Sequence, residues 1–183
     1  MDLVDALDRT FDHTHSVIAG IKPEQYDAPT PCSEWNVRAV MEHMVGVVAL
    51  MGAGASGQPL QRPQEFELAP DPAAQFADIA KRTITAWRAP GILDATMNAG
   101  PGDLPGRVYA NINLLDTATH TWDLAKATGQ PAALPDDVAI AALEASRQVV
   151  DPELRVGRFA EEVPVGSHAS CTDQLVAFLG RTP

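Results

Sequence analysis

The sequence predicts an all-α protein in which four long helices form a bundle. Apolar residues recur at helical spacing in four long segments, and the connections between these segments differ in length and are rich in Pro or Gly. No alternation of strands with helices is found, so the pattern does not favour an α/β fold. With 183 residues, of which 45% are hydrophobic, the chain is long enough for one well-cored domain over residues 1–183.

The first half of the chain predicts two helices separated by a rigid loop. Apolar residues recur from Leu3 to Ile21, and Lys22-Pro23 ends this first pattern. Residues 28–35, Ala-Pro-Thr-Pro-Cys-Ser-Glu-Trp, cannot form a regular helix because proline lacks an N–H donor and restricts the residue before it. Asn36 is a good N-cap for a second helix over residues 37–50, which we expect to end in the Gly-rich segment 52–57.

The remaining elements follow from similar start and stop signals. A Pro-rich polar connection leads to a third helix over residues 73–87, and residues 92–105 predict a loop with a brief extended piece. A fourth helix is predicted over residues 106–128, closed by Gly129. Pro135 opens a fifth helix that runs to about residue 150. The tail contains an alternating stretch over residues 159–165 and a short helix over residues 173–179.

The composition excludes several classes of partner. A net charge of −11, from 13 Lys and Arg against 24 Asp and Glu, argues against a nucleic-acid partner, because binding a phosphate backbone requires a basic surface. We expect no membrane partner, since no apolar run approaches the roughly 20 residues that span a bilayer and no signal peptide is found. The protein is therefore expected to be cytoplasmic, with Cys32 and Cys171 as free thiols. The oligomeric state stays open, with a homodimer among the alternatives.

A polar stripe on the fourth helix carries the functional signal. Asp116, His120 and Asp123 are four and seven residues apart, so they lie on nearly the same helix face. If this face is buried, a metal ion would satisfy these groups, whereas an exposed Asp116/His120 pair would contribute only about a few tenths of a kcal/mol. His43, on the apolar face of the second helix, is the best candidate for a third ligand, and its alternative role is that of a hydrogen-bonded core histidine.

The predicted ligand set contains two histidines and one carboxylate, His43, Asp116 and His120. Three protein ligands with an open position are typical of a catalytic zinc site. Asp123 would then be an alternative ligand or would accept a hydrogen bond from a ligating histidine. Other residues are assigned to the surroundings of the site: Arg38 would contact an anionic substrate, and Tyr109 and Asn113, which precede Asp116 on its own helix face, would line the cavity over the metal. Cys32 and Trp35 are expected to pack the rigid loop against the bundle.

Several motifs, in order, resemble one protein family. They are Pro29-Thr-Pro-Cys-Ser-Glu-Trp35, Val37-Arg38 with His43, Asp116-x-x-x-His120-x-x-Asp123-Leu124 and the final Leu175-Val-Ala-Phe-Leu-Gly-Arg-Thr-Pro183. Together they resemble the N-terminal domain family of mycothiol-dependent maleylpyruvate isomerase, within the wider group of DinB-like metal-binding helical bundles. The resemblance implies an up-down-down-up bundle with a divalent metal held at the positions of His43, Asp116 and His120.

The resemblance also indicates where this chain departs from the isomerase. The isomerase has a glutamate at the position of Asp116, so a shorter carboxylate must reach the ion here. It also carries an additional C-terminal domain, whereas this chain is expected to be a short single-domain member. The isomerisation therefore does not transfer directly, while the metal site and the use of a low-molecular-weight thiol do.

The sequence thus predicts a divalent-metal-binding protein that acts as a metal-dependent thiol S-transferase or isomerase-like enzyme. The metal is expected to be zinc, with nickel, iron and manganese as alternatives, because histidine and carboxylate ligands suit several ions. Its partners would be mycothiol or a similar small thiol and an unidentified electrophile, which would be selected by the loops over residues 52–72 and 92–105. The alternatives are a non-catalytic metal- or small-ligand-binding bundle and an interaction module whose polar stripe is a solvated helix face.

Overall fold

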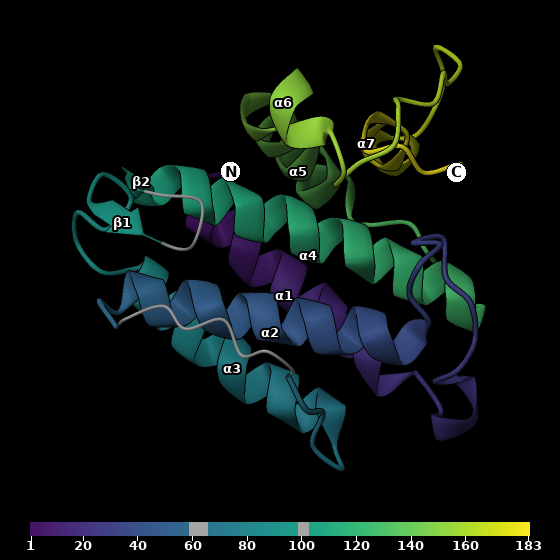
Figure 1. Cartoon of the computed structure of the whole chain (residues 1–183), viewed down its shortest axis with the longest axis horizontal. Helices are drawn as coiled ribbons and strands as arrows, with labels where there is room; N and C mark the ends of the chain where they lie inside the picture. Colours follow the sequence, from purple (N-terminus) through teal and green to yellow (C-terminus); the bar gives the residue numbers. More distant parts are fainter. Residues whose placement is uncertain (59–65, 99–102) are drawn as a thin grey trace.

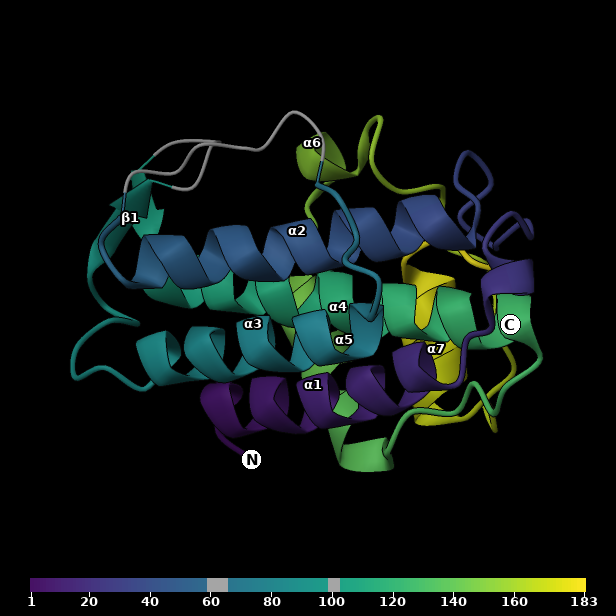
Figure 2. The ribbon, with the colours of Figure 1, turned by 90° about the horizontal axis from the view of Figure 1, so that it is seen from below.

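The computed structural model describes residues 1–58, 66–98 and 103–183, and these residues are mostly helical (Figure 1). The predicted all-α class is confirmed. Four long helices lie side by side in two perpendicular views (Figures 1 and 2): α1 (Leu3–Ala19), α2 (Val37–Ala55), α3 (Pro72–Trp87) and α4 (Gly106–Thr128). The helices α5 (Asp136–Val149), α6 (Pro152–Arg155) and α7 (Cys171–Phe178) follow, and α5 packs against both α4 and α7.

Two short elements complete the described part of the chain. A 3-10 turn, η1 (Pro23–Gln25), follows α1. The strands β1 (Thr96–Asn98) and β2 (Asp103–Pro105) pair antiparallel, with Met97 opposite Leu104. This hairpin is the brief extended piece predicted before α4. The predicted substrate-selecting loops over residues 52–72 and 92–105 include residues 59–65 and 99–102, which lie outside the described residues.

The start of α2 and the end of α4 form where local sequence signals place them. The side chain of Asn36 accepts a hydrogen bond from the N–H of Ala39 at 2.9 Å, which caps α2 as predicted. At the C-terminus of α4, Gly129 adopts a positive φ of 72°, and the next N–H, of Gln130, donates to the carbonyl of Ala125 at 2.9 Å. This pairing satisfies carbonyls that have no partner inside α4, so the helix ends at Thr128.

Helix α4 lies inside the protein and packs against α1, α2 and α5. Its polar residues are therefore buried along with its apolar ones. Thr121 illustrates how this is tolerated: its hydroxyl donates to the carbonyl of Thr117 at 2.7 Å and lies 2.7 Å from the hydroxyl of Thr14 on α1. Because each hydroxyl has a partner, α4 can be buried without a continuous apolar stripe.

Two details differ from the sequence prediction. Helix α2 continues to Ala55 instead of ending at Leu50, because Gly52 serves as a close contact with α3 and does not terminate the helix: a Cβ built there would lie 2.3 Å from the hydroxyl of Thr83. The helix α6 was not predicted. The alternating stretch over residues 159–165 is irregular, and the N–H of Val163 donates to the carbonyl of Ala177 at 3.0 Å.

Helix α2 is also more apolar than the sequence analysis allowed. By length and composition it could cross a membrane, with a mean hydropathy of 1.3 over its most apolar window, and 56% of that window is buried inside the protein. A core helix has the same properties. Part of this apolar surface packs against α3 and α4.

Candidate metal centre

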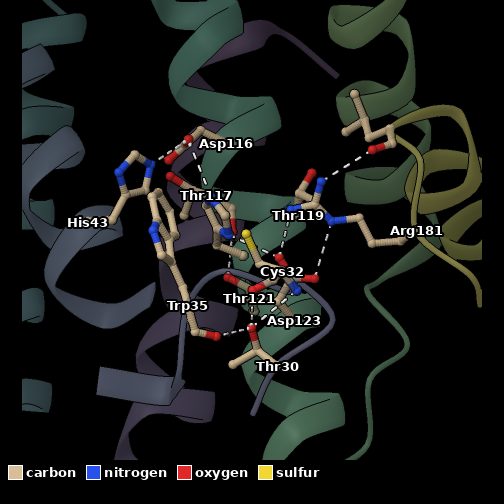
Figure 3. Close-up of polar contacts among 12 residues, drawn as sticks. Thr30, Cys32, Trp35, His43, Asp116, Thr117, Thr119, Thr121, Asp123 and Arg181 are labelled. Carbon is tan, nitrogen blue, oxygen red and sulfur yellow. Dashed lines mark hydrogen bonds and ion pairs between the residues drawn. The ribbon is translucent and has the colours of Figure 1, made fainter. Parts of the chain in front are cut away.

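Two neighbouring helices bring the three predicted ligands together. His43 comes from α2, and Asp116 and His120 come from successive turns of α4. The Nε2 of His43 lies 3.1 Å from Oδ1 of Asp116, and the Nε2 of His120 lies 3.7 Å from the same oxygen. The three donor atoms all lie within 4.8 Å of one another. Figure 3 shows His43 and Asp116 turned toward each other across the two helices.

The site is largely removed from solvent. The exposed fractions of the three side chains are 32% for His43, 18% for Asp116 and 9% for His120. The polar stripe of α4 therefore points into the protein toward α2, and the alternative of an exposed helix pair is wrong. The greater exposure of His43 indicates the side from which solvent reaches the donors.

The electrostatics of the site centre on Asp116. Burial alone would raise the pKa of its carboxyl, but the imidazoles of His120 and His43 outweigh burial and hold the pKa below its usual value. The second carboxylate oxygen, Oδ2, is buried and has no hydrogen-bond partner among the described residues. A buried carboxylate oxygen without a partner is costly, so this atom indicates a missing ligand.

The separations between Asp116 and the two histidines suit a divalent cation. Four ligands placed tetrahedrally at the usual zinc distances of about 2.0–2.1 Å are separated from one another by roughly 3.4 Å. The two separations measured from Oδ1 of Asp116, 3.1 and 3.7 Å, lie on either side of that value. The aspartate therefore reaches both histidines despite being shorter than a glutamate.

The rigid loop before α2 covers the donors. The hydroxyl of Thr30 contacts the backbone carbonyls of Cys32 and Trp35 at 3.1 and 2.8 Å, which folds the loop onto itself. The ring of Trp35 then lies 4.5 Å from that of His43 and 5.7 Å from that of His120, measured between centroids. Trp35 anchors the loop, as predicted. Its contact with both imidazoles was not foreseen, because it depends on how the loop folds over two helices.

Behind His120 lies a second polar cluster. The fully buried carboxylate of Asp123 lies 3.0 Å from Nδ1 of His120, and Arg181 donates to its two oxygens at 3.0 and 3.3 Å (Figure 3). Cys32 also lies close to His120 and Asp123. Because the guanidinium of Arg181 already neutralises Asp123, this cluster is a poor cation site. The geometry favours Asp123 as the hydrogen-bond partner of His120 over Asp123 as a ligand.

The two cysteines play no evident part in this centre as nucleophiles. Cys32 is half-buried, packs against the core and keeps the loop in place, as expected. Burial raises the pKa of its thiol, although Arg181 opposes that rise. Cys171 lies at the start of α7, and both cysteines are free thiols, as predicted.

The residues assigned to the surroundings of the metal have other contacts. The guanidinium of Arg38 lies over the ring of Tyr26 at 4.8 Å and 3.9 Å from the carboxylate of Glu42, with the side chain exposed to solvent. Tyr109 and Asn113 are completely buried in the core. The Nδ2 of Asn113 has no partner among the described residues. A role of Arg38, Tyr109 and Asn113 in cofactor binding stays a prediction.

Arg181 is the residue of this region that sequence reasoning missed. Its position near the C-terminal end of the sequence, 58 residues after Asp123, gave no hint of contact with α4. The one available signal was Asp123 itself, because a carboxylate on a buried helix face requires a cation or several donors.

Comparison with known proteins identifies the family. Residues 7–125 match the mycothiol maleylpyruvate isomerase N-terminal domain. The chain belongs to this family. The match to the mycothiol maleylpyruvate isomerase N-terminal domain includes all three candidate ligands and Asp123, and it ends before Arg181. The resemblance seen in the sequence motifs is thereby confirmed.

Two curated relatives cover the full chain. Both are described as uncharacterized proteins of Mycobacterium tuberculosis, one from strain CDC 1551 / Oshkosh and one from strain ATCC 25618 / H37Rv. Each is 37% identical over 186 residues, which covers 100% of this chain and 99% of the relative. No solved structure matches the chain.

Proposed function

We propose that the protein binds one divalent metal ion, zinc in the first instance, through His43, Asp116 and His120. We further propose that it acts as a metal-dependent thiol S-transferase or isomerase-like enzyme with mycothiol or a similar thiol as cosubstrate. The observation that carries the proposal is the convergence of three donor atoms from two helices at a partly buried point. The family supports the thiol, because its name describes a mycothiol-dependent isomerase domain.

The chain's own residues suit this chemistry. His43 and His120 can present neutral imidazole nitrogens, and Asp116 can present a carboxylate oxygen. Bound zinc would lower the pKa of a coordinated thiol enough to hold it as a thiolate. Three protein ligands leave a fourth position for that sulfur. Trp35 would restrict access from the side of the loop and would keep the imidazoles in place.

The second candidate is a non-catalytic metal- or small-ligand-binding bundle. It is favoured by the placement of the residues expected to contact substrate, since Tyr109 and Asn113 are fully buried and Arg38 is engaged with Tyr26 and Glu42. Both candidates share the metal site and differ in turnover.

The up-down-down-up helix order, the cytoplasmic location, the homodimer and the absence of nucleic-acid and membrane partners also stay predictions.

Metal content tests the site first. We expect about one equivalent of metal by inductively coupled plasma mass spectrometry in the tag-free protein and in His168→Ala, which changes an exposed histidine outside the site. We expect the metal to be lost in His120→Ala and Asp116→Ala. A wild-type protein that is empty and cannot be loaded with zinc would refute the metal site and, with it, the proposed enzyme.

Thiol transfer then separates the two candidates. The zinc-loaded protein is mixed with mycothiol and a panel of electrophiles, and loss of free thiol is followed with and without a chelator. Transfer that the chelator abolishes supports the enzyme. Binding of the thiol at the metal without turnover on any electrophile favours the non-catalytic bundle, and transfer that survives removal of the metal contradicts the metal-dependent mechanism.

A further inference from the structure

The orientation of His120 depends on a buried carboxylate outside the ligand set. Asp123 follows His120 by one helical turn, and none of its side chain is exposed. Its Oδ2 lies 3.0 Å from Nδ1 of His120. An ionised carboxylate can only accept hydrogen bonds, so this contact requires the proton of the imidazole to be on Nδ1. In the neutral imidazole the lone pair is then on Nε2, the nitrogen that faces Asp116.

Asp123 is in turn held by Arg181 from the other end of the chain. The Nη2 of Arg181 donates to Oδ2 at 3.0 Å and its Nε donates to Oδ1 at 3.3 Å, so both carboxylate oxygens are engaged by one planar group. The Arg181 side chain is itself 10% exposed. A third donor, Nη1, bonds the carbonyl of Leu179 at 3.2 Å, which fixes the guanidinium within its own segment.

The backbone turn after α7 places Arg181 next to Asp123. The N–H of Gly180 donates to the carbonyl of Ala177, and the N–H of Arg181 donates to that of Val176, at 3.0 and 2.9 Å. These two bonds form a Schellman motif, in which Gly180 adopts a positive φ of 81°. A Cβ at Gly180 would also lie 2.7 Å from the Cβ and the carbonyl oxygen of Ala160. The turn that aims Arg181 at α4 is therefore tightly constrained.

From these contacts we propose that Arg181 is a positioning residue for the candidate metal centre. It fixes the plane of the Asp123 carboxylate, which fixes the tautomer and the orientation of His120 and directs Nε2 toward His43 and Asp116. The functional meaning of this inference rests on the proposed metal site, but each contact in the chain of three residues exists in the protein without a metal. The C-terminal segment thus supplies a part of the centre that lies outside the family match over residues 7–125.

A different reading gives Arg181 only a structural role, in which the ion pair docks the segment after α7 against α4. The two readings differ in what the loss of the guanidinium changes. Docking alone predicts lower stability, with an unchanged imidazole tautomer and unchanged zinc affinity of the folded protein. Positioning predicts that both of these properties change while the fold is retained.

The test compares Arg181→Gln and Arg181→Lys with Arg107→Gln, a control that removes an exposed arginine paired with Asp94. Long-range ¹H–¹⁵N spectra of the metal-free proteins report the tautomer of His120, and competition with a chromophoric chelator reports zinc affinity. We expect the Nδ1–H tautomer in the wild type and in Arg107→Gln, and a mixture of tautomers in Arg181→Gln. Zinc affinity should fall roughly 10-fold or more in Arg181→Gln, with Arg181→Lys intermediate.

The double variant shows whether Arg181 acts through Asp123. The combination of Asp123→Asn with Arg181→Gln should bind zinc no more weakly than Asp123→Asn alone, because the carboxylate that Arg181 orients is already gone. Additive losses would overturn the proposal. It is also overturned if Arg181→Gln keeps the wild-type tautomer and affinity. If Arg181→Gln does not fold, Arg181→Lys decides, since a single ammonium cannot hold both carboxylate oxygens in the same plane.

Failure of the metal site and failure of this inference give different results. A wild-type protein that binds no zinc refutes the proposed function, and the tautomer spectra then decide the role of Arg181 without any metal. A wild-type protein that binds zinc with an affinity unaffected by Arg181→Gln and Arg181→Lys supports the metal site and refutes the positioning role.

Discussion

Replacing Gly52 by alanine tests the packing of the helix that carries His43. Gly52 lies on the face of α2 that contacts α3, opposite Thr83. A Cβ at this position would lie 2.3 Å from the hydroxyl oxygen, 3.0 Å from the Cβ and 3.1 Å from the Cα of Thr83. Because the last of these atoms belongs to the backbone, rotating the threonine side chain cannot relieve all of the overlap.

The expected cost is the balance of three contributions. Overpacking a close helix contact costs about 1–3 kcal/mol. The Thr83 hydroxyl donates to the carbonyl of Val48 at 3.0 Å, and breaking that buried bond costs about 1 kcal/mol more. Alanine is a better helix former than glycine, which offsets about 1 kcal/mol of this cost. The net loss in the free energy of unfolding is about 2 kcal/mol, or roughly 4–8 °C in Tm for a domain of this size.

Thermal and urea unfolding, followed by circular dichroism at 222 nm, measure this loss. The control is Gly166→Ala, because a Cβ at Gly166 meets nothing within 4 Å. The double variant with Thr83→Ala removes the closest atom, so Gly52→Ala should cost less in that background than in the wild type. A Gly52→Ala protein as stable as the wild type would refute the close approach of α2 and α3 described here.

Three further predictions concern the metal site, a thiol and a helix cap. Zinc at about 100 times its Kd should stabilise the wild type and His168→Ala by about 2.7 kcal/mol, or roughly 5–10 °C in Tm. It should not stabilise His43→Ala. Equal shifts in Tm in all three proteins would exclude His43 as a ligand. Iodoacetamide should alkylate Cys32 more slowly at pH 7.5 in the folded protein than in urea, because burial raises the pKa of its thiol, and equal rates would contradict this burial. Asp2→Ala should lower stability by about 1 kcal/mol at neutral pH, because the Asp2 side chain accepts hydrogen bonds from the first turn of α1. Hydrogen bonds from Asp5 and Val4 lower the pKa of Asp2 below 3.8. The stabilisation by Asp2 is therefore complete above pH 3.8 and is lost as the pH falls through the lowered pKa. In urea titrations, the stability difference between the wild type and Asp2→Ala should be smaller at pH 2 than at pH 7.

The features that sequence reasoning predicted correctly are local ones. Asn36 caps α2 and Gly129 ends α4 because each acts on backbone groups within a few residues of itself. The spacing of Asp116 and His120 likewise sets both side chains on one helix face, whatever surrounds the helix. Their meeting with His43 required a pairing of α2 with α4, and that pairing was supplied by the family resemblance together with the apolar surroundings of His43.

The features that were missed depend on packing between distant segments. The Gly-rich segment over residues 52–57 was expected to end the helix, because glycine destabilises a helix, yet the contact of Gly52 with Thr83 requires a residue without a side chain. Arg181 reaches Asp123 through a turn that the sequence shows only as a Gly-Arg dipeptide near its end. In both cases the informative partner lies on another helix, and no spacing rule connects the two positions.

The burial of α4 gives a reason to regard its acidic and histidine side chains as a site. Most threonines of this helix satisfy their hydroxyls locally: Thr119, for example, donates to the carbonyl of Leu115 at 2.6 Å. Asp116 and Asp123 contact His120 on their own helix and also take partners from outside it, His43 on α2 and Arg181 after α7. Hydrogen-bonded hydroxyls are inexpensive to bury, whereas two carboxylates within two turns are costly and require dedicated partners. A fold that needed only a packed α4 could place apolar residues at both positions, so the cost of these charges supports the proposed metal site, in which Asp116 and the two histidines would bind the ion and Asp123 would position His120.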